Sequence, residues 1–106
     1  MTLTRIARWD VALDGPLSEA AIQQKIEVLG FEVAARTYPA GLAAETPSDR
    51  RQSITAVVHG TVKLTVNGEE AVLSAGDIAF IPGGVLRRLE DVGTSTALCL
   101  EAYLPL

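Results

Sequence analysis

The sequence has 106 residues, of which 48% are hydrophobic, and a formal net charge of −4. This length supports one domain with a single hydrophobic core, and the apolar content argues against disorder. The acidic balance provides no basic patch, so we expect neither nucleic acid nor a membrane as a partner.

Targeting signals and cysteine content indicate the compartment. No apolar run approaches the roughly 20 residues that a membrane-spanning helix needs, and residues 1–10 lack the apolar core of a signal peptide. The single cysteine, Cys99, excludes an internal disulfide and fits a reducing environment. We therefore expect a cytoplasmic protein in which Cys99 is a small, inert apolar residue.

The N-terminal segment alternates loosely between apolar and polar residues. Over residues 3–13 this pattern predicts an edge strand. The strand carries Trp9, for which we expect a packing or dimer-contact role, because large aromatic side chains dominate cores and interfaces. An Asp-Gly-Pro sequence at residues 14–16 then interrupts the chain.

A helix is predicted to begin at Ser18 and to end before Gly30. Ser18 is a suitable N-cap residue, and Gly30 suits the position that follows a helix C-terminus. Ile22, Ile26 and Leu29 form one apolar stripe. We expect this stripe to pack on the outer face of the β-structure, and a helix that binds a partner is the alternative.

The next segments predict strands separated by a polar loop. Residues 31–38 alternate again, which is typical of a half-buried strand. Residues 42–52 form a long polar segment of the kind that often binds ligands over a rigid scaffold, although a solvated surface loop fits equally well. Residues 53–59 and 61–66 then predict a pair of strands, with His59 at its exposed end.

Residues 67–90 carry a series of turn signals. Asn-Gly at 67–68 lies between two alternating runs, which is the strongest short-range signal for a hairpin. Gly-Asp at 76–77 predicts a second reversal, and Pro82 ends the short buried strand 78–81. Two glycines then allow residues 85–90 to return as a further strand.

The last predicted strand covers residues 96–103. Glu101 shares one of its faces with Ala97, Cys99 and Tyr103, whereas Leu98 and Leu100 lie on the other. The sequence leaves open which face is interior.

The order Gly-Asp, four residues, Pro, one residue and Gly, followed by a returning strand, resembles the second conserved motif of the cupins. Residues 53–60, followed by a strand and Asn-Gly, resemble the end of the first motif. The resemblance covers residues 31–104 and implies an all-β fold, a jelly-roll barrel of the double-stranded β-helix type with one N-terminal α-helix. It divides the chain into a strand-and-helix extension, residues 1–30, and a barrel, residues 31–106.

The chain departs from the metal-dependent cupins at the positions of their metal ligands. Those proteins carry two His and a Glu in the first motif and a His in the second, where this sequence has Pro47, Asp49, Ser53 and Arg87. The resemblance therefore implies the barrel without its usual metal. The composition agrees, because one His and one Cys do not supply the three or four ligands of a transition-metal site.

Three roles for Arg87 remain open. Arg87 can form a salt bridge with Asp49 or Glu101 in place of the metal. Its guanidinium can face a cavity and bind a carboxylate or phosphate. Alternatively, the side chain can extend out of the barrel mouth into water.

We therefore expect a binding or sensing module, without metal or cofactor, that takes a small anionic molecule in the barrel. The resemblance and strand alternation assign the pocket to Asp49, Arg51, Ser53, Thr55, Arg87 and Glu101. We assign no catalytic residue, because no nucleophile and base can be assembled from the sequence. The alternative is a cupin-type isomerase, lyase or oxygenase that acts on a small molecule with an atypical metal or none. The family relation also implies a homodimer.

Overall fold

The computed structural model describes residues 5–46 and 50–105, and all structural statements refer to these residues. They form nine strands and two helices. In chain order these are β1 (Arg5–Arg8), α1 (Val11–Asp14), α2 (Glu19–Val28), β2 (Glu32–Tyr38), β3 (Ala43–Thr46), β4 (Ser53–His59), β5 (Thr61–Val66), β6 (Glu69–Ser74), β7 (Asp77–Ile81), β8 (Arg87–Asp91) and β9 (Ala97–Tyr103).

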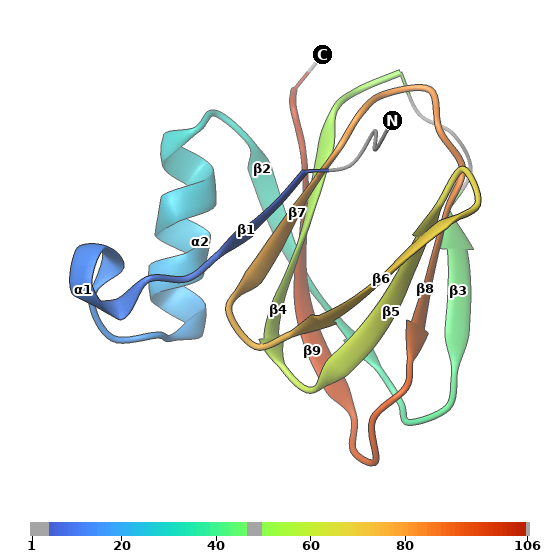
Figure 1. The fold of residues 1–106 in the computed structure, drawn as a ribbon. Helices are drawn as coiled ribbons and strands as arrows, with labels where there is room; N and C mark the ends of the chain where they lie inside the picture. The colour runs from blue at the N-terminus through green and yellow to red at the C-terminus, as the bar shows by residue number, and fades with distance from the viewer. Residues whose placement is uncertain (1–4, 47–49, 106) are drawn as a thin grey trace.

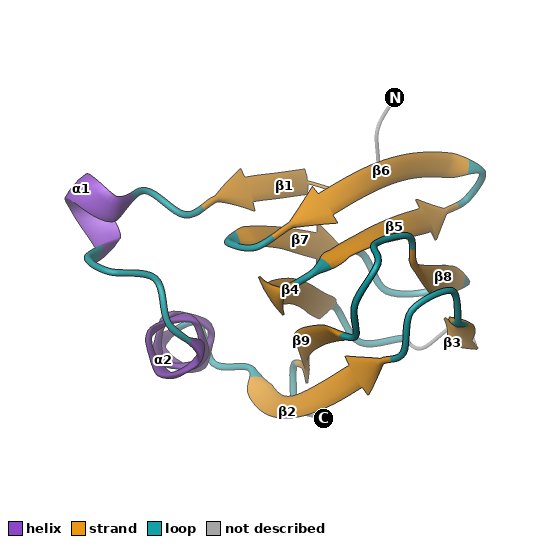
Figure 2. Cartoon of the chain, turned by 90° about the horizontal axis from the view of Figure 1, so that it is seen from below, coloured by secondary structure: helices purple, strands orange, loops and turns teal. Residues whose placement is uncertain are grey.

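The strands form two antiparallel sheets that face each other (Figures 1 and 2). One sheet has five strands in the order β1-β7-β4-β9-β2, and the other has four in the order β3-β8-β5-β6. This arrangement confirms the predicted all-β jelly roll with an N-terminal helix. The division at residue 30 stays a prediction, and β1 pairs with β7 at the edge of the five-stranded sheet.

Two hydrophobic clusters lie on opposite faces of the five-stranded sheet. The inner cluster fills the space between the sheets and includes Val57, Leu73 and Cys99. The outer cluster joins Ile22 and Ile26 of α2 to the outer face of the sheet. Because both faces are covered, β4 is buried along most of its length, with no contrast between its two sides.

Helix α2 forms as predicted at its N-terminus. The side chain of Ser18 accepts a hydrogen bond from the amide of Ala21 at 3.1 Å, as an N-cap residue does. Ile22 and Ile26 are buried, which confirms that the stripe packs on the outside of the sheet. Leu29 was expected in this stripe, but it is 52% exposed because it lies at the C-cap, beyond the last helical turn.

The prediction of one strand over residues 3–13 is wrong for its second half, where α1 forms. Strand β1 ends at Arg8, and the carboxylate of Asp10 accepts a hydrogen bond from the amide of Ala12 at 2.9 Å. This N-cap bond satisfies a free amide of the next turn and so favours a short helix over a continued strand. Trp9 is partly buried and packs against the outer cluster.

The prediction of a loop over residues 42–52 is wrong for residues 43–46, which form β3. This strand pairs with β8, so that Thr46 lies opposite Arg87. Its side chains carry no marked apolar pattern, and main-chain pairing with an otherwise open sheet edge accounts for it. Neither helix of the described residues is long and apolar enough to cross a membrane.

Candidate functional site

The pairing of β4 with β9 brings polar side chains together inside the barrel. Ser53 lies opposite Tyr103, and Thr55 lies opposite Glu101. Because side chains alternate along a strand, Ser53 and Thr55 share the inner face of β4 with Val57 of the inner cluster. The same rule resolves the question that the sequence left open, since Glu101 and Tyr103 lie on the inner face of β9 with Cys99.

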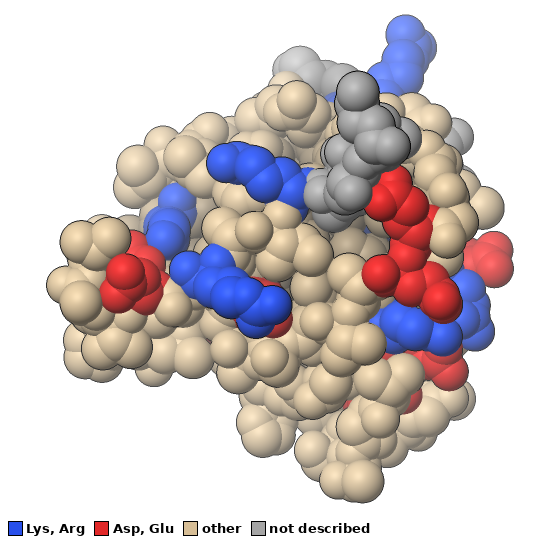
Figure 3. Space-filling view, viewed as in Figure 1, with Lys and Arg blue, Asp and Glu red and all other residues tan. Residues whose placement is uncertain are grey.

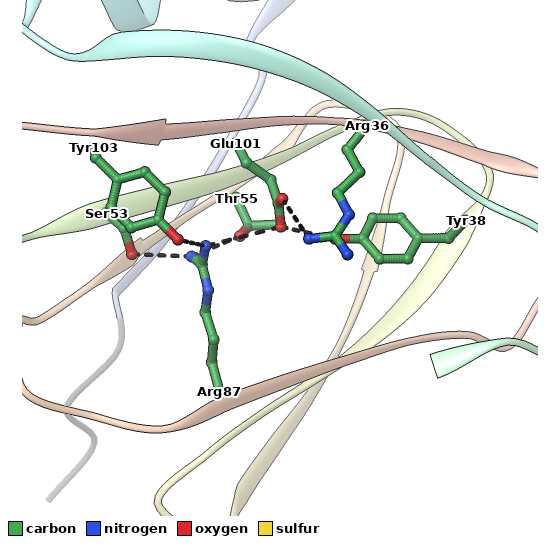
Figure 4. A network of polar contacts seen from close by, with 7 residues as sticks. All are labelled: Arg36, Tyr38, Ser53, Thr55, Arg87, Glu101 and Tyr103. Carbon is green, nitrogen blue, oxygen red and sulfur yellow. Dashed lines mark hydrogen bonds and ion pairs between the residues drawn. The ribbon is translucent and has the colours of Figure 1, made fainter. Parts of the chain in front are cut away.

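Arg87 extends from β8 of the four-stranded sheet across the interior to the five-stranded sheet (Figure 4). Its Nη1 donates hydrogen bonds to Ser53 Oγ at 2.9 Å and to Thr55 Oγ1 at 3.3 Å. Its Nη2 donates to Tyr103 Oη at 2.6 Å. Arg87 is only 5% exposed, so the interpretation in which it extends into bulk water is wrong.

Glu101 lies between two arginines. Its Oε1 is 3.8 Å from Nη2 of Arg87 and accepts a hydrogen bond from Tyr38 Oη at 2.8 Å. Its Oε2 is 3.5 Å from Nη1 of Arg36. The predicted pairing of Arg87 with Glu101 is therefore present, but it is longer than the bonds from Arg87 to the three hydroxyls.

This geometry leaves the charge of Arg87 weakly compensated. Three neutral hydroxyl groups make its short contacts, whereas the carboxylate of Glu101 also interacts with Arg36. Hydroxyls satisfy the N–H donors of a guanidinium, but they do not neutralise its charge, and a buried charge is costly without a close partner. The described residues leave no fully buried side-chain N or O atom without a hydrogen-bond partner. The hydrogen bonds of the network are therefore satisfied, but the positive charge of Arg87 is only partly compensated.

The remaining predicted residues are Arg51 and Asp49. The guanidinium carbon of Arg51 is 4.7 Å from the centroid of the Tyr103 ring, and that of Arg87 is 5.2 Å from the same centroid. Two guanidinium groups therefore interact with one aromatic ring. Asp49 lies outside the described residues. The structure thus brings five of the six predicted residues to one end of the barrel.

Sequence reasoning missed three members of this cluster, namely Tyr103, Tyr38 and Arg36. Side chains two positions apart in a strand lie on the same face, so Tyr103 shares a face with Glu101, and Arg36 shares a face with Tyr38. Knowledge of the inner face of β9 would have identified Tyr103. Arg36 and Tyr38 required the register of β2 with β9, which the sequence does not specify.

Among the described residues, only a small cavity lies next to Arg87 at the polar end of the barrel. The cavity next to Arg87 has a volume of about 10 Å³, which holds about one water molecule. Its walls include Thr46, Arg51, Val85 and Tyr103. Gly83 contributes to the tight packing here, because its backbone lies so close to the carbonyl of Arg50 that a side chain at position 83 would overlap with it.

Two interior groups have strongly shifted pKa values. Burial raises the pKa of the Cys99 thiol to about 12, with a further contribution from the negative charge of Glu101. Burial also raises the pKa of Tyr38, and Glu101 adds to the shift through its charge and its hydrogen bond. Both shifts keep the groups protonated at neutral pH, so neither provides a base or a thiolate nucleophile there.

The two described residues at the family's metal position, Ser53 and Arg87, do not fit a divalent cation. Such an ion would require imidazole, thiolate or several carboxylate ligands, whereas this end of the barrel carries hydroxyls, Glu101 and the fixed positive charge of Arg87. Within residues 5–46 and 50–105, no group of three or more His, Cys, Asp and Glu residues is arranged to hold a metal ion. His59 lies exposed at the end of β4, away from the polar network.

Comparison with known proteins places these observations in a family. Solved structures with the same fold include a predicted oxalate decarboxylase from Thermotoga maritima, with 19% identity and a TM-score of 0.65 over 97% of this chain and 81% of that one. A cupin protein from Bacteroides fragilis shares 25% identity, with a TM-score of 0.64 over 71% of this chain and 65% of that one.

A third structure, the cupin domain of an XRE family transcriptional regulator from Enterobacter cloacae, has 11% identity and a TM-score of 0.67 over 99% of both chains. No curated protein matches this sequence. Residues 36–103, well over half of the chain, match the sequence family described as the cupin domain. The chain therefore belongs to the cupin family.

Proposed function

We propose that this cupin domain is a binding module for a small anionic molecule, whose carboxylate or phosphate group contacts Arg87 at the polar end of the barrel. One observation carries the proposal. A buried guanidinium makes its short contacts with three hydroxyls and shares its carboxylate partner with a second arginine. A bound anion would compensate the positive charge of Arg87.

The chemistry of the surrounding groups supports an anionic ligand. A planar guanidinium binds carboxylate or phosphate oxygens through two parallel hydrogen bonds, which are stronger than bonds to neutral acceptors. The hydroxyls of Ser53, Thr55 and Tyr103 now accept hydrogen bonds from Arg87, but each can rotate to donate one to a ligand oxygen. The site can therefore exchange its internal bonds for bonds to a ligand without leaving polar groups unpaired.

Ligand binding requires the polar end to open. The present cavity admits about one water molecule, so a carboxylate or phosphate needs the wall formed by Arg51 and Val85 to move. The free energy of opening is subtracted from the affinity, because only the open fraction of the protein can bind. We therefore expect a ligand small enough to need only a local movement of this wall.

We favour binding over catalysis because of the protonation states inside the barrel. Because their pKa values are raised, Cys99 and Tyr38 are poorly suited to act as general bases at neutral pH. The relationship to the predicted oxalate decarboxylase of Thermotoga maritima rests on 19% identity and concerns the fold alone.

A thermal-shift experiment with matched variants tests the proposal. The probes are acetate, oxalate, citrate, inorganic phosphate and glycerol phosphate. A ligand at 100 times its dissociation constant should stabilise the wild type by about 2.7 kcal/mol, which raises Tm by several degrees. Arg87→Lys keeps the positive charge but loses the planar fork, so the same ligand should produce little or no shift.

Arg88→Ala is the matched control. Arg88 lies next to Arg87 on the other face of β8 and forms an ion pair with Glu90 at 3.1 Å. The variant should therefore keep the full ligand-induced shift. Equal shifts in the wild type and in Arg87→Lys would remove Arg87 from the site. Stoichiometric iron, manganese, nickel or zinc in the purified protein would contradict a metal-free barrel.

A further inference from the structure

A pocket of about 230 Å³ lies at one end of the five-stranded sheet, and we call it the outer pocket. Its lining includes Arg5 of β1, Phe80 of β7 with Pro82 after it, Gln52 before β4, and Phe31 before β2. The volume is slightly below the range of about 300–1,000 Å³ that is typical of drug-sized ligands, so the pocket suits a ligand with a single ring.

The strand register places the outer pocket on the face of the sheet that points away from the barrel interior. Arg5 lies opposite Phe80, and Phe80 lies opposite Ile54 of the outer cluster, so these three side chains share the outer face. Gln52 is two positions before Ile54 and has the same direction. The sheet therefore separates this pocket from Arg87, which binds the residues of the inner face.

Aromatic side chains flank the outer pocket. The chain has two phenylalanines, Phe31 and Phe80, and both line this pocket and pack against the outer cluster. They belong to opposite sides of the sheet, because β4 and β9 lie between β7 and β2. Aromatic rings gain from stacked or edge-to-face contacts with another ring, in addition to the gain from burial. The pocket therefore favours a flat aromatic group between the two phenylalanines.

Arg5 provides the charge of the outer pocket. Its guanidinium carbon lies over the ring of Phe80, 4.2 Å from the ring centroid. A guanidinium in such a position still presents N–H groups that can bind a carboxylate. No acidic side chain lines the pocket, and within residues 5–46 and 50–105 no carboxylate forms an ion pair with Arg5. A positive charge thus lies next to the aromatic side chains.

The charges around β1 agree with an anionic ligand. In the space-filling view, basic side chains lie over β1, whereas acidic side chains gather at the right, over β5 and β6 (Figure 3). The second arginine of β1, Arg8, forms an ion pair with Asp77 at 3.1 Å. Despite the net charge of −4, the side of the molecule that carries the outer pocket therefore attracts an anion.

We propose that the outer pocket binds a small aromatic carboxylate with one ring, of the benzoate class, at a site independent of Arg87. The ring lies between Phe31 and Phe80, and the carboxylate accepts hydrogen bonds from the guanidinium of Arg5. The exposed amide of Gln52 is available to a hydroxyl or another polar group on the ring. An aliphatic acid would lose the ring contacts, and an uncharged ring would lose the charge-assisted hydrogen bonds.

Selective isotope labelling provides a readout from this pocket alone, because both phenylalanines of the chain line it. In protein labelled with ¹⁵N-phenylalanine, the amide signals of Phe31 and Phe80 should both move on titration with sodium benzoate and give the same dissociation constant. Acetate lacks the ring and benzamide lacks the charge, so each should bind about tenfold more weakly or worse.

Three variants locate the site. Arg5→Gln should weaken benzoate binding about tenfold, and because Arg5 is exposed the fold should be unaffected, which circular dichroism checks. Arg8→Gln is the matched control, since it removes the same charge from the same strand outside the pocket, and it should bind benzoate like the wild type. Arg87→Lys should also bind benzoate normally, which separates this site from the one proposed inside the barrel.

Two results would overturn the proposal. One is a pair of phenylalanine signals that do not move at millimolar benzoate. The other is an affinity for benzoate that is equal in the wild type and in Arg5→Gln. If that affinity were instead lost in Arg87→Lys, the acid would bind inside the barrel and the outer pocket would not be its site.

Discussion

The two ends of the barrel interior are built from the same strands but contain opposite kinds of side chain. β4 contributes Ser53 and Thr55 to one end and Val57 towards the other, while β9 contributes Tyr103 and Glu101 to one end and Cys99 and Ala97 to the other. Leu73 of β6 lies at the apolar end, opposite Val62 of β5. Strand alternation determines which positions point inward, and the residue types at those positions make one end polar and the other apolar.

The two ends of the barrel differ in how much they contribute to stability. Each fully buried aliphatic side chain at the apolar end contributes about 1.5–3 kcal/mol by leaving water. The buried charges at the polar end contribute little net stability, because apolar residues of similar size would serve at least as well. The polar end therefore needs a reason other than stability, and the proposed binding of an anion would provide one.

The largest expected effect is at the apolar end. Leu73 is fully buried, so Leu73→Ala removes buried apolar surface and leaves a cavity, at a cost of about 2–5 kcal/mol in the free energy of unfolding. Urea denaturation measures this loss. A cost well below 1 kcal/mol would mean that the apolar end does not carry the stability of the barrel.

A loss in the lower part of that range is expected from Glu101→Gln at the polar end. The amide keeps an oxygen that can accept the hydrogen bond of Tyr38, but Arg87 and Arg36 lose the carboxylate between them. An uncompensated buried charge of this kind costs about 3 kcal/mol. The double variant Glu101→Gln/Arg87→Met should regain part of that loss, because it removes the unpaired guanidinium. If the double variant were less stable than Glu101→Gln, the arginine would not depend on this carboxylate.

Removal of one hydroxyl should have a milder effect. Tyr103→Phe deletes the acceptor at 2.6 Å from Arg87, which keeps its bonds to Ser53 and Thr55, so we expect a loss of about 1 kcal/mol. Tyr38→Phe is a control of the same chemistry, because it deletes the hydroxyl that binds Glu101 instead. A loss in Tyr103→Phe as large as that in Glu101→Gln would mean that this hydroxyl, rather than the carboxylate, holds the guanidinium.

At neutral pH, the smallest effect comes from the ionisation of Cys99. The folded state raises the pKa of this thiol from its ordinary 9.0 to about 12, so between these values the unfolded chain loses its proton while the folded chain keeps it. The free energy of unfolding should be independent of this group below pH 9 and should fall as the pH rises towards 12. Cys99→Ala should show a shallower fall over the same range. Identical slopes would contradict a buried, protonated thiol.

Local turn chemistry explains why residues 67–87 could be predicted from the sequence. Asn67 and Gly68 have positive φ angles of 50° and 79°, as a two-residue hairpin turn requires, and the Gly-Asp and Pro-Gly-Gly segments fix the strand that follows. The inward positions of Ser53 and Thr55 followed from the family position of Ser53. Each of these inferences used residues that are close together in the chain.

The inner face of β9 could not be predicted because both of its faces are covered. Leu100 belongs to the outer cluster, whereas Cys99 packs between the sheets, so the alternation carries little contrast in polarity. Helix α1 gave no periodic signal, because it has four residues and is fixed by a cap and by the contact of Lys25 with Asp14. Strand β3 depends on main-chain pairing with β8, which leaves no pattern in its side chains.

The tight contact at Gly83 makes the polar end of the barrel sensitive to a single methyl group. A Cβ at this position would overlap with the backbone carbonyl of Arg50, and a backbone atom cannot rotate out of the way as a side chain can. Alanine at position 83 would therefore displace the backbone at Arg50 and Arg51. The substitution would widen the small cavity next to Arg87 while the polar groups around it stay the same.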